Sequence, residues 1–142
     1  MQKARASRVV EILDRNGIRK TSIRQDVLSV FLENEDIALS NHELEGKLQE
    51  SDRVTLYRTL KTFEKKGIIH QAIDGSGVNK YAMCHADCSE HEHLDNHAHF
   101  HCENCGKTLC LEEIHTPKVN VPAGYKVDAS YMVIQGTCKD CL

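Results

Sequence analysis

Apolar residues recur at helical spacing in four stretches of the first 67 residues, and each stretch carries signals for its ends. The first covers residues 4–16 and stops at Asn16-Gly17, and the second begins at Thr21 or Ser22. Small polar residues of this kind accept hydrogen bonds from the first free N–H groups of a helix. The pattern therefore predicts two helices separated by a short turn.

The third and fourth stretches follow the same logic. Ser40 with Glu43 three residues later forms a capping box, which opens a short helix. Asp52 can cap a longer helix, and Gly67 lies just past the end of that helix, where a left-handed residue is common. Three or four short helices are thus expected before residue 68.

Two short β-like runs, IIHQAI and VNKYAM, flank residues 74–77 and predict a hairpin. Helices followed by a hairpin are the order of a winged helix-turn-helix, although an all-α domain with an appended ribbon would share that order. The fourth helix favours DNA binding, because its exposed face carries Arg53, Tyr57, Arg58 and Lys61. In the winged fold this helix enters the major groove, where Arg reads guanine and Lys or Tyr holds phosphate.

The composition changes after Met83. Residues 84–96 are polar, acidic and rich in His, without periodicity, which predicts a hinge loop between two domains. Residues 97–111 are expected to form two strands around a Cys-x-x-Cys-Gly knuckle, and residues 118–136 to form further strands broken at Pro122–Gly124. A second knuckle, CKDC, ends the sequence.

Charge separates the same two halves. The net charge is −3, but residues 1–80 hold 14 Lys and Arg against 12 Asp and Glu, while residues 81–142 hold 4 against 9. A basic half joined to an acidic, Cys- and His-rich half suggests two tasks in one chain of 142 residues. The small second half would need a further source of stability, such as a bound metal.

The seven cysteines all lie at or after Cys84. No apolar run is long enough for a membrane span, and the N-terminal MQKARASRVVEIL lacks the apolar core of a secretory signal. We therefore expect a cytoplasmic protein without membrane contact, in which cysteines serve metals rather than a disulfide framework.

The two knuckles are the strongest chemical signal. Cys102, Cys105, Cys138 and Cys141 offer two pairs of thiolates at the spacing that completes a tetrahedron around Zn²⁺. Four thiolates leave no open position, so this site is expected to be structural. The alternative is two redox-active pairs.

The histidines before the first knuckle predict a separate site. On a strand, His97 and His99 point to one face, while His101 shares that face and is expected to be exposed. Pairing in the 74–77 hairpin would bring His70 near Cys84. Together His70, Cys84, His97 and His99 would join both domains through one metal with N₃S ligands, which suits Zn²⁺ better than Mg²⁺ or Ca²⁺. Otherwise these are solvated surface histidines.

Several motifs follow one another in a specific order along nearly the whole chain. They are GIRKT at 17–21 with Arg24 and Val27-Leu28, TLYRTL at 55–60, Phe63-Glu64 with Gly67, Tyr81, the run HAHFHCENCGK, and the closing Cys-x-x-Cys. In this order and spacing the chain resembles the ferric uptake regulator (Fur) family of bacterial metal-sensing repressors, and most of all its zinc uptake regulator branch.

The resemblance implies an α+β fold. An N-terminal winged helix-turn-helix would cover residues 1–83, a hinge loop 84–96, and a β-rich, zinc-stapled dimerisation domain 97–142. It implies a homodimer that represses metal uptake genes at AT-rich palindromic DNA, with the hinge metal as co-repressor. Tyr57, Arg58 and Lys61 would contact the operator, and Arg19 and Arg24 would hold its backbone.

The resemblance also bears on the metal and on the alternatives. Iron- and peroxide-sensing members usually use carboxylates and histidines at the hinge, so Cys84 favours zinc over ferrous iron. An iron- or peroxide-responsive regulator stays open, as does a basal transcription factor with structural zinc alone. A zinc-dependent hydrolase with Glu90 or Glu92 as base is the alternative from another class, but no substrate-pocket motif supports an enzyme.

The chain departs from the family pattern in its second half. A second His-x-His pair would fall at Asn96 and Ala98, so that metal site is expected to be lost. The long hinge adds Cys88, His85, His91 and His93, any of which could replace Cys84 or form an extra site. Prolines and Gly124 leave little room for the usual helix between the knuckles, and Cys110 is expected to be buried rather than reactive.

Overall fold

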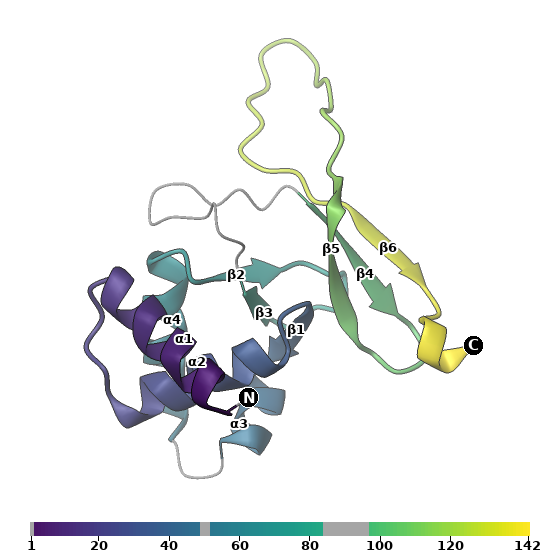
Figure 1. Ribbon diagram of the computed structural model, residues 1–142. Coiled ribbons are helices and arrows are strands. Elements are labelled where there is room, and N and C mark those ends of the chain that lie inside the picture. The colour runs from purple at the N-terminus through teal and green to yellow at the C-terminus, as the bar shows by residue number, and fades with distance from the viewer. Residues whose placement is uncertain (1, 49–51, 84–96) are drawn as a thin grey trace.

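The chain folds into a group of helices beside one curled sheet (Figure 1). This computed structural model describes residues 2–48, 52–83 and 97–142. The fold is α+β, with a winged helix-turn-helix in the first half and β-structure in the second, as predicted. The predicted domain division at 84–96 lies outside the described residues. Among the described residues, no helix combines the length and the apolar character needed to cross a membrane.

The helices begin where their capping residues predict. Thr21 accepts a hydrogen bond from the N–H of Arg24, and Asp52 accepts one from the N–H of Thr55. Ser40 and Glu43 form both hydrogen bonds of a capping box. The helices are α1 (Gln2–Arg15), α2 (Ser22–Glu33), α3 (Asn41–Lys47), α4 (Arg53–Lys65) and the short 3₁₀ helix η1 (Lys139–Cys141).

Six strands form one sheet in the order β2-β3-β1-β5-β4-β6. The predicted hairpin is present as β2 and β3, and the strands flanking the first knuckle are β4 and β5. Strand β1 was not predicted. The strands are β1 (Ile37–Ser40), β2 (Ile69–Ala72), β3 (Lys80–Met83), β4 (His97–Cys102), β5 (Thr108–His115) and β6 (Val133–Gly136).

Strand β1 joins the two halves of the chain. It lies between α2 and α3, within the helix-turn-helix, and it has a neighbour on each side. Leu39 pairs with Tyr81 of β3, and Ile37 pairs with Leu109 of β5. The N–H of Cys110 also donates to the carbonyl of Asp36 at 2.9 Å. Backbone hydrogen bonds therefore connect the winged helix-turn-helix directly to the C-terminal strands.

The inner face of the curled sheet carries small side chains. Ala38 of β1, Ala72 of β2, Ala82 of β3 and Cys110 of β5 form one buried cluster. Small side chains let neighbouring strands bend toward one another without overlap. On this face β2 and β4 approach each other although three strands separate them in the sheet order, and the ring centroids of His70 and His97 are 5.1 Å apart.

The larger core lies between the helices and the N-terminal strands. It consists of buried aliphatic and aromatic side chains from the four α-helices, from β1, β2 and β3, and from the turns that connect these elements. The core includes Leu13, Leu28, Phe31, Leu56, Leu60, Phe63 and Tyr81.

Truncation of Leu28 to alanine should show how much this core contributes. Leu28 is fully buried on α2, so Leu28→Ala is expected to lower the free energy of unfolding by about 2–5 kcal/mol. Val54→Ala is the matched control, because Val54 is 58% exposed and its loss should change stability by less than about 0.5 kcal/mol. Urea unfolding followed by circular dichroism measures both; equal effects would contradict this core.

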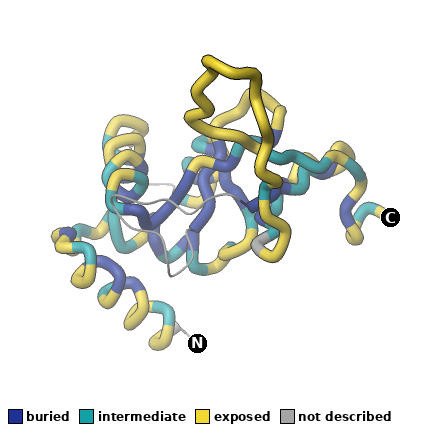
Figure 2. Tube along the Cα trace, turned by 90° about the horizontal axis from the view of Figure 1, so that it is seen from above, coloured by how far each residue is buried: buried dark blue, intermediate teal, exposed yellow. Residues whose placement is uncertain are grey.

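The segment between β5 and β6 differs from the prediction. Residues 116–132, all of them described, form no helix and no strand, so the predicted strands over 118–136 are wrong except at Val133–Gly136. The expected absence of a helix between the knuckles is confirmed for this segment. It extends from the sheet as a long exposed loop (Figure 2).

Candidate metal centres

Strands β4 and β6 bring the two cysteine knuckles together. They run parallel, and Cys102 at the end of β4 lies opposite Gly136 at the end of β6. Cys105 follows in the turn after β4, while Cys138 directly precedes η1 and Cys141 is its last residue. The knuckles are therefore adjacent because both parallel strands end at the same edge.

The four thiols have the spacing of a tetrahedral site. All four Sγ atoms lie within 4.8 Å of one another, and Cys105 Sγ lies 3.8 Å from Cys138 Sγ. A tetrahedron with Zn–S bonds of about 2.3 Å has edges of about 3.8 Å. The arrangement fits a closed Cys₄ metal site of the structural kind.

The surroundings of this site favour thiolates. The N–H groups of Cys105 and Cys138 donate to Cys102 Sγ at 3.5 Å and 3.3 Å and help to lower the pKa of Cys102 to about 6. For Cys141, a contact with Asn104 favours the thiolate, but the neighbouring thiols and burial raise its pKa to about 11. Four crowded thiols cannot all ionise without a cation between them, so a bound divalent metal would resolve this conflict.

A second cluster lies inside the curl of the sheet. It consists of His70 from β2, His97 and His99 from β4, and Cys110 from β5. All four residues are buried, and their potential ligand atoms lie within 4.8 Å of one another. The cluster therefore draws one ligand from the first half of the chain and three from the second.

The ring geometry keeps the donors of this cluster close. The ring centroids of His97 and His99 are 4.8 Å apart, and His70 lies 5.1 Å from His97 and 5.9 Å from His99. Cys110 Sγ lies 3.8 Å from His70 Nε2. An N···S edge of a tetrahedral zinc site is about 3.6 Å, so the four donors surround a space of suitable size.

The protonation state of His99 is compatible with metal binding at this cluster. Burial, with a contribution from His97, lowers the pKa of His99 to about 4, so His99 is neutral near pH 7. Its Nε2 atom is buried and has no hydrogen-bond partner among the described residues. A neutral imidazole with an unsatisfied buried nitrogen is suited to a metal. Three imidazoles and a thiol form an N₃S set that fits a borderline transition metal.

The cluster agrees in part with the sequence-based expectation. His70, His97 and His99 come together as predicted. Cys84 lies outside the described residues, as do the further candidates His85, Cys88, His91 and His93. Cys110 is buried as expected, but its place among the histidines was missed.

The hairpin register contains the signal that would have identified Cys110. The N–H of Cys102 donates to the carbonyl of Lys107 across the first knuckle, at 2.9 Å. Counting outward from this pair in an antiparallel hairpin places Cys110 opposite His99, which is the observed pairing. The knuckle therefore fixes which cysteine faces the histidines.

His101 was expected to be exposed, and this expectation is wrong. Its side chain is only 15% exposed, and its Nδ1 lies 3.1 Å from Thr108 Oγ1 and 3.4 Å from Asp74 Oδ2. Although it shares the strand with His97 and His99, it belongs to a different polar cluster, beside the hairpin of β2 and β3.

The candidate DNA-contacting residues of α4 lie on exposed surface. On α4, Leu56, Leu60 and Phe63 are buried, which leaves Tyr57 and Arg58 on the outer face. Other exposed residues of this face are Arg53 and Lys61, and the Lys61 ammonium lies 5.4 Å from the Tyr57 ring centre.

The remaining two candidates lie before and within α2. Arg19 is exposed, while Arg24 is half-buried and donates to the carbonyl of Arg19 at 3.0 Å. Both side chains are basic, and Arg24 is held in place by that contact.

Comparisons with known proteins agree on the family. The profile of the ferric uptake regulator family matches residues 15–133. The chain is 27% identical to the peroxide operon regulator of Bacillus subtilis (strain 168), over 93% of this chain and 90% of that protein. It is 30% identical to a ferric uptake regulation protein of Staphylococcus aureus (strain Mu50), over 93% and 94%.

A solved structure shows the same fold. The zinc uptake regulator complexed with zinc and DNA superposes with a TM-score of 0.62 at 20% identity, over 96% of this chain and 91% of that chain. The profile covers most of the chain, and a relative at 30% identity spans nearly all of it. The chain therefore belongs to the ferric uptake regulator family and is a metal-dependent transcriptional regulator rather than an enzyme.

Proposed function

We propose that this protein is a zinc-responsive repressor of metal uptake genes, with zinc at the His70–His97–His99–Cys110 cluster as its co-repressor. One observation carries the proposal: four buried donors from both halves of the chain lie within 4.8 Å of one another. A metal held there would supply bonds between β2 of the wing and the β4–β5 hairpin. The Cys₄ site would hold a second, structural zinc.

The choice of zinc over ferrous iron rests on the thiol. Thiolate ligands select zinc and other soft or borderline metals, whereas carboxylates suit harder cations. The ligand cluster contains Cys110 and no carboxylate among its four members. An iron- or peroxide-responsive regulator is the second candidate, because three imidazoles also suit iron and relatives at similar identity carry such names.

The cluster can act as a switch because its ligands belong to different parts of the chain. His70 follows α4 through a short turn, while His97, His99 and Cys110 belong to the C-terminal strands. A ligand that binds only the closed arrangement shifts the population toward that arrangement. Closure would then fix α4 relative to the C-terminal half.

DNA binding is assigned to α4 and the residues around α2. Two copies of α4 at a fixed separation can enter successive major grooves of an AT-rich palindrome. Tyr57, Arg58 and Lys61 are the proposed operator contacts, and Arg19 and Arg24 are the proposed contacts to the DNA backbone.

A homodimer is proposed through the C-terminal half. Apolar side chains of the loop between β5 and β6 are exposed, and β6 is the last strand of the sheet order. An exposed apolar surface next to a strand edge is suited to a second copy. The exposed residues are Val119, Val121, Tyr125, Val127 and Tyr131. We further propose a cytoplasmic location, because reduced thiols are needed at both clusters.

Operator affinity against buffered free metal is the test of the proposed function. Fluorescence anisotropy with an AT-rich palindrome from an uptake gene should show tight binding that trace zinc switches on. Ferrous iron under anaerobic conditions is the comparison. Switching by iron alone would assign the protein to the iron-responsive regulators, and binding that ignores both metals would contradict a sensing role for the cluster.

Removal of the Arg58 guanidinium should weaken operator binding. One bidentate contact to a base contributes about 1–3 kcal/mol, so Arg58→Ala should lower affinity roughly 5- to 150-fold. Zinc content should stay the same, because Arg58 lies on the exposed face of α4. Arg15→Ala, which removes an exposed charge at the end of α1, is the control. Full affinity in the Arg58 variant would count against α4 as the recognition helix.

A further inference from the structure

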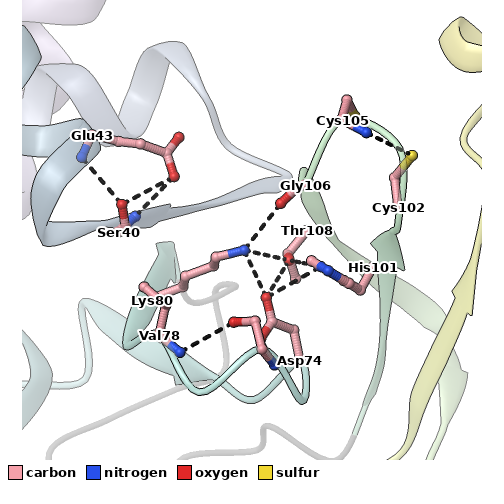
Figure 3. Close-up of polar contacts among 11 residues, drawn as sticks. Ser40, Glu43, Asp74, Val78, Lys80, His101, Cys102, Cys105, Gly106 and Thr108 are labelled. Atoms are coloured by element: carbon pink, nitrogen blue, oxygen red, sulfur yellow. Dashed lines mark hydrogen bonds and ion pairs between the residues drawn. The ribbon is translucent and has the colours of Figure 1, made fainter.

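A polar cluster distinct from the two candidate metal centres joins the wing to the C-terminal strands. We call it the Asp74 cluster: Asp74, Lys80, His101, Thr108 and the carbonyl of Gly106 (Figure 3). Asp74 and Lys80 belong to the hairpin of β2 and β3. The other three members belong to β4, the first knuckle and β5.

Every donor of the lysine is used. Lys80 Nζ lies 2.7 Å from Asp74 Oδ2, and it donates to Gly106 O at 3.1 Å and to Thr108 Oγ1 at 3.0 Å. An ammonium has three N–H donors, so this one is fully satisfied. Two of its three partners come from the other half of the chain.

The carboxylate is satisfied in the same way. Asp74 accepts from the Thr108 hydroxyl at 2.6 Å and from the N–H of Ser76 at 2.9 Å. Burial alone would raise the pKa of Asp74, but the hydrogen bonds from Lys80, Ser76 and Thr108 outweigh it and hold the pKa below the usual value. Asp74 is therefore a charged acceptor.

Burial makes this cluster sensitive to the contact between the halves. The side chains of Asp74 and Lys80 are 1% and 8% exposed. A buried ion pair is tolerated only when further hydrogen bonds satisfy it, and here those bonds come largely from β5 and the knuckle. If the wing moved away, the pair would return to water and lose the contacts to Thr108, Gly106 and His101.

We propose that the Asp74 cluster is a metal-independent fastening that holds the wing against the β4–β5 hairpin and thereby sets how much zinc the histidine cluster needs. The second clause rests on the proposed function. Asp74 and Thr108 are positioning residues, because they bond to Lys80 and to each other and are not themselves candidate metal ligands. A metal that binds only the closed arrangement has an apparent affinity scaled by the closed fraction. Weakening the fastening should therefore weaken zinc binding without removing a ligand.

The test uses two variants that keep the side-chain shape. Asp74→Asn alters the contact from the side of the β2–β3 hairpin, and Thr108→Val alters it from the side of β5. Loss of a hydrogen bond to a charged group shifts an equilibrium about 10-fold or more. We expect zinc affinity at the histidine cluster to fall about 10-fold in competition with a chromophoric chelator, while one zinc stays at the Cys₄ site. Operator affinity should return to within about threefold of the original at saturating zinc.

The matched control is Gln71→Ala. Gln71 is exposed on the same hairpin and donates to Asn79 at 2.9 Å, so this bond stays within the hairpin. Its zinc affinity should be unchanged. Unchanged zinc affinity in both cluster variants, with intact circular dichroism spectra, would overturn the proposal.

A second measurement separates this proposal from the proposed function. In protein with only the Cys₄ zinc, hydrogen exchange of the Cys110 amide reports on the β1–β5 contact, because this amide donates to Asp36. Asp74→Asn should speed that exchange, and Gln71→Ala should not. Unchanged exchange would overturn the fastening even if zinc switches DNA binding. If exchange is faster but DNA binding does not respond to zinc, the fastening is supported and only its link to zinc affinity is refuted.

Discussion

Cys110→Ser should remove the zinc response of operator binding. Cys110 lies among His70, His97 and His99, and serine keeps its size while losing the thiolate. Even residues that only orient metal ligands change affinity 10- to 100-fold, so loss of a direct ligand should raise the zinc needed for half-maximal DNA binding by at least about 100-fold. Anisotropy titrations against buffered zinc measure this shift.

The controls decide between two cysteines. His115→Asn replaces an exposed histidine at the end of β5 and should leave the zinc response unchanged. Cys84→Ser tests the ligand that the sequence suggested. If Cys84→Ser abolishes the response and Cys110→Ser preserves it, our assignment of the fourth ligand is wrong.

A carboxylate at this position would probe the choice of metal. In Cys110→Asp the ligand set becomes N₃O, which suits harder cations such as ferrous iron or manganese better than a thiolate does. The expected outcome is a preference that moves from zinc toward ferrous iron in the same titration. An unchanged preference would show that the thiol does not set the selectivity.

Cys102→Ser should abolish the fold of the C-terminal half. Cys102 is fully buried at the end of β4 and accepts N–H groups from both knuckles. Metal binding at such a site contributes folding free energy directly, because the unfolded chain has no preformed site. We expect loss of one bound zinc per chain, loss of the cooperative thermal transition and loss of the dimer.

Zinc content by atomic absorption, thermal unfolding by circular dichroism, and analytical ultracentrifugation together measure this outcome. Cys110→Ser is the matched control, since it removes a buried thiol from the other cluster and should retain the Cys₄ zinc. A folded, dimeric Cys102→Ser protein with full thermal stability would contradict a structural role for the knuckles.

The local part of the fold could be predicted from the sequence. The caps at Thr21, Ser40 and Asp52 are short-range signals, because each cap bonds an N–H only three residues away. Gly67, with φ of 79°, follows α4 in the left-handed conformation that glycine adopts most readily. These choices depend on nearby residues alone, and the structure agrees with them.

The non-local part could not be predicted in the same way. Strand β1 has four residues and shows no pattern of its own; it is a strand because β3 and β5 pair with it. For residues 118–132 the error was the opposite one: strands were predicted, and the structure has none there. Val119 and Val121 alternate like a strand, but the described chain offers them no partner strand.

The two candidate metal centres also differ in whether they depend on local or on non-local structure. The Cys₄ group follows from spacing within two short knuckles, whereas the histidine cluster depends on the curl of the sheet. Ala38, Ala72 and Ala82 are buried together on the inner face of the curl, and a pattern of alternation does not reveal which strand will bend. Cys110 was missed because its position depends on a hairpin register, not on a motif.

Strand β1 also limits how this regulator can be recombined. Its four residues belong to the helix-turn-helix, yet one of its edges is completed by β5 from the other end of the chain. A helix-turn-helix exchanged between regulators would bring an edge that the host's β5 must match in register and side-chain size. We therefore expect new combinations of operator specificity and metal response to arise by substitutions on the α4 surface rather than by exchange of whole domains.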